Sequence, residues 1–115
     1  MPHVLVIENA YLFAQYLKDV VTLAGASSVS IATTQSAAIA AANEQKPDLI
    51  MSDVRLEEGD GLAAVNDIIS NHGNMPIIFV NGNNLETSRF PHGSILLRKP
   101  VTPIAILAAI NHAVI

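Results

Sequence analysis

The chain has 115 residues, of which 50 % are hydrophobic, and a formal net charge of −4. This length suits a single domain with its own core. The chain has 6 Lys+Arg and 10 Asp+Glu residues, so acidic residues outnumber basic ones. Binding to the phosphate backbone of nucleic acids depends on an excess of cations, so we expect no DNA partner. The absence of cysteine excludes disulfides, thiol catalysis and zinc–thiolate sites. We find neither an apolar run of membrane-spanning length nor a signal peptide, which predicts a cytoplasmic protein without a membrane partner.

Short apolar runs alternate with segments of helical periodicity along the whole chain. Strands are predicted at His3–Glu8, Ser28–Ala32, Asp48–Asp53, Ile77–Val80 and Ser94–Leu97. Helices are predicted at Ala10–Ala24, Ser36–Ala42, Leu62–Ile69 and Ile104–Val114.

Capping residues support these boundaries. Thr33 or Thr34 can cap the second helix, and Thr102 followed by Pro at the first helical position can cap the last one. Gly25 and Gly73 stand just past the ends of the first and third helices. The stretch Asn81–Gly93 has little periodicity, so a helix there should be short or irregular, and its start could alternatively be a hairpin turn.

Five strands that alternate with helices predict an α/β fold, a doubly wound parallel sheet with helices on both faces. Because crossover connections are right-handed, the strand order 2-1-3-4-5 is the one that we expect. In such a sheet all strands point their carboxyl ends at the same edge, where ligands bind.

Polar residues stand at four of these strand ends. They are Glu8 and Asn9, Asp53, Asn81 and Gly82, and Arg98 and Lys99. Each could be an ordinary loop or capping residue. Together, two carboxylates and a lysine have the chemistry of a Mg²⁺ and phosphate site.

The chain resembles, along its whole length, the receiver domains of the two-component response-regulator family. The resemblance rests on Val4–Asn9, Pro47–Asp53, Gly59–Leu62, Pro76–Val80 and Leu97–Pro100. The connection between the fourth and fifth strands looks shorter than usual, as in stand-alone receivers of alphaproteobacteria. The resemblance therefore implies one receiver domain over residues 1–115 with no output domain.

The resemblance also implies roles for individual residues. Asp53 matches the phosphoacceptor, which takes a phosphoryl group from a histidine kinase or a phosphotransfer protein, so the chain is expected to be a signalling protein rather than an enzyme. Lys99, with Asn81 and Gly82, matches the phosphoryl-contacting positions, and Pro100 matches a proline whose preceding peptide bond is usually cis. The implied Mg²⁺ ligands are Glu8, Asn9, Asp53 and the backbone carbonyl of Arg55.

Three positions depart from the family pattern. Asn9 replaces a second acid, so we expect weak Mg²⁺ binding. Asn81 replaces a Thr or Ser and Leu96 replaces an aromatic residue, so the usual coupled switch is not expected. Two hypotheses follow: Asp53 is phosphorylated with a non-standard output, which we favour because Asp53 and Lys99 are retained, or a degenerate receiver works as a phosphorylation-independent interaction module.

The last helix carries two apolar stripes. Because one stripe suffices to cover the sheet, we expect the other, which contains Ile106, Ala109, Ile110 and Ala113, to face solvent or a partner and to be a candidate homodimer surface. The remaining apolar stripe consists of Ile104, Leu107 and Ala108. The histidines show no metal-ligand spacing and are expected at the surface; they are His3, His72, His92 and His112.

Two other classes with a similar sheet fit poorly. A phosphatase of the haloacid-dehalogenase type needs a second Asp two residues after the first, where Arg55 stands. A flavodoxin-like cofactor binder needs a hydroxyl-rich phosphate loop after the first strand, where Glu8 would instead repel phosphate.

Overall fold

The computed structural model describes residues 3–56, 58–82 and 90–114. The elements, in chain order, are β1 (His3–Ile7), α1 (Tyr11–Leu23), β2 (Ser28–Ala32), α2 (Gln35–Glu44), β3 (Leu49–Ser52), α3 (Gly61–His72), β4 (Ile77–Asn81), β5 (Ile95–Arg98) and α4 (Pro103–Val114). The predicted irregular helix between β4 and β5, and the alternative hairpin, lie largely outside the described residues.

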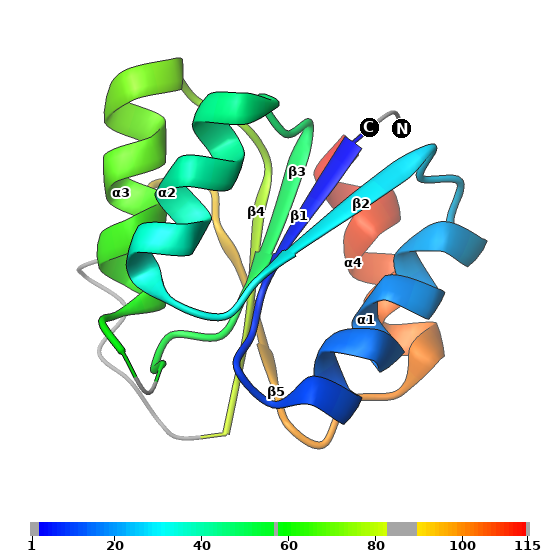
Figure 1. Ribbon diagram of the computed structural model, residues 1–115. Coiled ribbons are helices and arrows are strands. Elements are labelled where there is room, and N and C mark those ends of the chain that lie inside the picture. Colours follow the sequence, from blue (N-terminus) through cyan, green and yellow to red (C-terminus); the bar gives the residue numbers. More distant parts are fainter. Residues whose placement is uncertain (1–2, 57, 83–89, 115) are drawn as a thin grey trace.

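The five strands form one parallel sheet in the order β2-β1-β3-β4-β5, as the sequence predicts. Helices α1 and α4 cover one face of the sheet, and α2 and α3 cover the other (Figure 1). The carboxyl ends of the strands therefore gather at one edge, which lies at the bottom of Figure 1.

The positions of the side chains of β1 explain the apolar run Val4–Ile7. Val4 and Val6 pack into the cluster under α1 and α4, whereas Leu5 and Ile7 pack into the cluster under α2 and α3. Since successive side chains of a strand point to opposite faces, and both faces of this central strand are covered, the four residues Val4–Ile7 are all hydrophobic.

The predicted helix ends are confirmed in most cases. The Thr34 hydroxyl accepts a hydrogen bond from the Ala37 amide at 3.1 Å, and the Thr102 hydroxyl accepts one from the Ala105 amide at 3.1 Å. Gly73 is the C-cap of α3 with φ +87°, a backbone conformation that glycine adopts without strain. The local signals thus fix where these helices begin and end.

Two expectations about exposure are wrong. His3 is buried, and its ring nitrogens lie 2.7 Å from the Ser28 hydroxyl and 3.2 Å from the Ser30 hydroxyl, both on the neighbouring strand β2. The stripe of α4 that contains Ile106 and Ile110 packs into the core instead of facing a partner. In the other stripe Ile104 is 79 % exposed and Ala108 is exposed as well, because α4 is rotated so that the Ile106 stripe meets β4 and β5.

Candidate functional site

The ladder of backbone hydrogen bonds continues past the strand ends and aligns the polar residues there. The Asp53 amide donates to the Ile7 carbonyl at 2.8 Å, which ties the end of β3 to the end of β1. On the other side, the Lys99 amide donates to the Asn81 carbonyl at 2.8 Å. The same pairing that builds the sheet therefore brings these segments to one edge.

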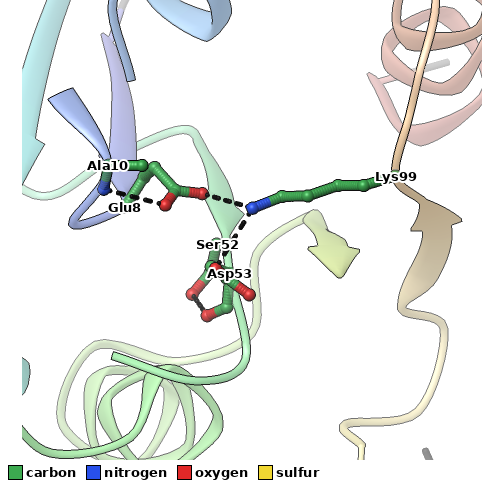
Figure 2. Close-up of polar contacts among 5 residues, drawn as sticks. All are labelled: Glu8, Ala10, Ser52, Asp53 and Lys99. Carbon is green, nitrogen blue, oxygen red and sulfur yellow. Dashed lines mark hydrogen bonds and ion pairs between the residues drawn. The ribbon is translucent and has the colours of Figure 1, made fainter. Parts of the chain in front are cut away.

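Lys99 joins the two carboxylates at this edge. Its Nζ lies 3.1 Å from Glu8 Oε1 and 3.3 Å from Asp53 Oδ2. Figure 2 shows the lysine side chain reaching across from the end of β5 to both acids. The sequence prediction that these three residues converge is thus confirmed in its geometry.

The burial of the cluster explains why it must be paired. The Glu8 side chain is only 1 % exposed, against 12 % for Asp53 and 27 % for Lys99. A buried carboxylate is costly unless it is compensated, and Glu8 has two compensating contacts. Besides Lys99, its Oε2 accepts the Ala10 amide at 3.0 Å, next to the N-terminus of α1, where the helix dipole favours negative charge.

The backbone of Asp53 is held by two residues that the sequence analysis did not single out. The Ser52 hydroxyl donates to the Asp53 carbonyl at 2.7 Å. Gly61 lies so close that a Cβ at this position would overlap the same carbonyl oxygen, and its amide donates to the Val54 carbonyl at 2.8 Å. The glycines of the Gly59–Leu62 motif were the available signal for this close approach.

The loop after Asp53 is braced from two sides. Asp60 caps α3 by accepting the Leu62 amide at 2.7 Å, and its own amide donates to the Gln35 side-chain carbonyl at 3.0 Å. Arg55 pairs with Asp60 through an isolated antiparallel bridge. The position whose carbonyl was expected to bind Mg²⁺ is therefore fixed close behind Asp53.

The remaining predicted residues also lie at this edge. Asn9 follows Glu8 and is half-buried, and Asn81 is the buried last residue of β4, with Gly82 exposed beside it. A further neighbour was missed: Lys99 Nζ lies over the Phe13 ring, 4.4 Å from its centroid. Phe13 belongs to the first turn of α1. Because this helix begins at the edge of the sheet where Lys99 lies, a residue of its first turn could have been expected near the lysine.

The donor atoms near Asp53 suit a hard cation, though sparsely. Glu8, Asp53, Asn9 and the Arg55 carbonyl all offer oxygen, and Mg²⁺ is commonly held by one or two carboxylates with water and phosphate oxygens. Within residues 3–56, 58–82 and 90–114, no group of three or more Asp, Glu, His or Cys side chains is placed to hold a metal. The chemistry of these oxygen donors is compatible with Mg²⁺ completed by water or phosphate oxygens.

The family of the chain follows from a match over nearly its whole length. The family model described as "Response regulator receiver domain" matches residues 4–111. The chain belongs to the response regulator receiver domain family. Receiver domains are signalling proteins rather than classical enzymes, and they generally bind Mg²⁺.

Individual relatives agree with this assignment. The chain is 33 % identical over 114 residues to the phyllosphere-induced regulator PhyR of Methylorubrum extorquens. This match covers 96 % of the chain and 42 % of the relative. The solution structure of the PhyR receiver domain of Erythrobacter litoralis is 30 % identical, with a TM-score of 0.87 and coverage of 96 % and 88 % of the two chains.

A third relative carries a more specific description. The crystal structure named anti-anti-sigma factor PhyR from Bartonella quintana is 31 % identical, with a TM-score of 0.78, and the match covers 96 % of this receiver chain and 46 % of that chain. The receiver chain thus spans less than half the length of this protein and of the Methylorubrum relative.

In the part of the chain that the structure describes, no helix is long and apolar enough to cross a bilayer.

Proposed function

We propose that the receiver domain relays a signal by accepting a phosphoryl group on Asp53 from the phosphohistidine of a histidine kinase or of a phosphotransfer protein. The observation that carries the proposal is the contact of Lys99 Nζ with Asp53 Oδ2 at 3.3 Å. It places a fixed positive charge beside the carboxylate that would receive the phosphoryl group.

The proposed transfer is an in-line displacement. An Asp53 carboxylate oxygen attacks phosphorus, a P–O bond forms, and the bond from phosphorus to the imidazole nitrogen breaks with its electron pair left on nitrogen. The product is an acyl phosphate. Lys99 stabilises the charge on the transferring group, and the amide of Asn81 and the backbone of Gly82 are proposed to donate hydrogen bonds to its oxygens.

Glu8, Asn9, Asp53 and the Arg55 carbonyl are the residues proposed to hold Mg²⁺. When bound, this ion supplies positive charge beside the phosphoryl oxygens. Because Asn9 is neutral, only two carboxylates contribute charge, and the affinity is proposed to be weak. One oxygen of Glu8 already contacts Lys99 and the other accepts a hydrogen bond from the Ala10 amide. These contacts compete with a metal ion and therefore also favour weak Mg²⁺ binding.

The readout of phosphorylation is proposed to be non-standard. Asn81 has no hydroxyl to move toward a phosphoryl group, and Leu96, in register with Phe79 on β4, is not aromatic. The relative named anti-anti-sigma factor suggests an output through contact with another protein, in keeping with the expected cytoplasmic location. We also propose that the domain can self-associate through α4, with the exposed Ile104 in place of the buried Ile106 as the contact residue.

One observation favours the second candidate function, a phosphorylation-independent interaction module. Lys99 is ion-paired to Glu8 as well as to Asp53, so the cluster is electrically satisfied without a phosphoryl group and could serve stability alone. Amide NMR with beryllofluoride and excess Mg²⁺ separates the two. We expect shifts around Asp53, Asn81 and Lys99 in wild type and none in Asp53→Asn, whereas an unchanged wild-type spectrum would favour the module.

A further inference from the structure

The ammonium of Lys99 has a third neighbour besides the two carboxylates. Its Nζ lies 4.4 Å from the centroid of the Phe13 ring, within the distance at which the negative face of an aromatic ring attracts a cation. Phe13 is half-buried and packs against the core cluster under α1 and α4. The ammonium is thus held from three directions: by Glu8, by Asp53 and by the ring.

Helix α1 contacts the lysine-bearing segment at a second point, one turn further on. The Tyr16 hydroxyl donates to the Val101 carbonyl at 2.9 Å. The Tyr16 and Phe13 rings are tilted neighbours with centroids 5.6 Å apart. Helix α1 therefore contacts this segment twice, through Phe13 at the ammonium of Lys99 and through Tyr16 at the backbone of Val101.

We propose that Phe13 is a positioning residue for Lys99: the electron-rich face of its ring fixes the lysine ammonium at the point from which it meets both Asp53 and an incoming phosphoryl group. The inference rests on the proposed phosphoacceptor function of Asp53 for its effect on rate, but not for the contact itself. An aliphatic side chain of similar size would fill the same space without attracting the ammonium.

The strength of such a contact follows the electron density of the ring, whereas packing follows its shape. A series of phenylalanines with one, two and five ring fluorines is introduced at position 13 alone. Fluorination lowers the electron density of the ring face while nearly preserving the shape of the ring. Phe90 is the matched control, because it pairs with Phe79 at a centroid distance of 4.7 Å in the other core cluster, under α2 and α3.

The first measurement needs no phosphorylation. Protons on the Cε of Lys99 should be shifted upfield in the NMR spectrum relative to those of the exposed Lys46, because the Nζ bonded to this carbon lies over the face of the Phe13 ring. We expect this difference to shrink stepwise with fluorination at position 13 and to stay unchanged with fluorination at position 90. Equal shifts for Lys99 and Lys46 in wild type would overturn the proposal.

The second measurement is the rate at which phosphoramidate phosphorylates the protein in excess Mg²⁺. Pentafluorination at position 13, and Phe13→Leu, should slow it by roughly two- to fivefold, the range given by a partly exposed cation–π contact. A phosphorylated wild type with an unchanged pentafluoro variant would overturn the positioning role alone. An unphosphorylated wild type would overturn the proposed function, and the Lys99 shifts would still decide the contact.

Discussion

Glu8 and Lys99 are 91 positions apart in the chain, yet Glu8 Oε1 lies 3.1 Å from Lys99 Nζ. This ion pair joins the ends of β1 and β5, which are not neighbours in the sheet. It compensates an almost completely buried carboxylate and holds the ammonium beside Asp53. The pair therefore links the stability of the domain to the geometry of its proposed phosphorylation site.

Replacing Lys99 by methionine should destabilise the domain. The substitution keeps much of the side-chain volume but leaves the Glu8 carboxylate with only the Ala10 amide, and stranding a buried charge is costly. Because Lys99 is 27 % exposed, we expect a loss of roughly 1–3 kcal/mol in the free energy of unfolding. Urea denaturation measures it.

Two controls sharpen this prediction. The exposed Lys46 carries the same charge, and Lys46→Met should change stability by less than about 0.5 kcal/mol. Adding Glu8→Gln to Lys99→Met removes the stranded charge and should recover part of the loss. If the single and double variants are equally unstable, the Glu8 charge is not what Lys99 compensates.

Replacing Gly61 by alanine tests how Asp53 is held. The added Cβ would overlap the Asp53 carbonyl oxygen, so the segment that carries the acceptor has to shift, at a cost of at least about 2 kcal/mol. Gly82→Ala is the matched control, since nothing lies within 4 Å of a Cβ added there. Similar unfolding midpoints for the two variants would contradict this packing.

The two stripes of α4 can be told apart by one charge on each. Ile106 is fully buried, whereas Ile104 is 79 % exposed. Ile106→Glu should abolish or severely weaken folding, because an unpaired carboxylate would enter the core, while Ile104→Glu should leave stability within about 0.5 kcal/mol. Circular dichroism on heating checks both.

Sedimentation velocity of the folded Ile104→Glu variant then tests self-association through α4. If wild type dimerises through this helix, the variant should be monomeric at the same concentration. A dimer that survives the Ile104→Glu substitution would place the contact elsewhere.

Converting Asn9 to aspartate should tighten Mg²⁺ binding by roughly tenfold, because it restores a third carboxylate beside Glu8 and Asp53. Titration followed by amide NMR shifts measures the affinity. Asn74→Asp adds the same charge just before β4, at the opposite end of the sheet, and should have little effect. Equal affinities for wild type and the Asn9 variant would mean that Asn9 is not at the metal site.

Much of the fold could be predicted because its signals are local. The apolar runs, the capping threonines and the terminal glycines identify the elements, and the handedness of crossovers then limits the strand order. The convergence of Glu8, Asp53 and Lys99 follows from the topology alone, since parallel strands end at one edge.

What could not be predicted depends on how helices are rotated and packed. Both stripes of α4 are apolar, so the pattern alone does not say which one faces the sheet, and Ile106 was placed on the wrong side. His3 was expected at the surface because it shows no metal-ligand spacing, and its two hydroxyl partners, Ser28 and Ser30, could not be foreseen because they lie on a different strand. The contact of Phe13 with Lys99 likewise depends on the orientation of α1 over the sheet edge.

Intact-mass spectrometry after incubation with phosphoramidate and Mg²⁺ tests the central claim most directly. Wild type should gain the mass of one phosphoryl group, the gain should be lost on treatment with hydroxylamine, as an acyl phosphate requires, and Asp53→Asn should gain nothing. A wild-type protein that gains no mass, or a variant that gains as much as wild type, would contradict the assignment of Asp53 as the phosphoacceptor.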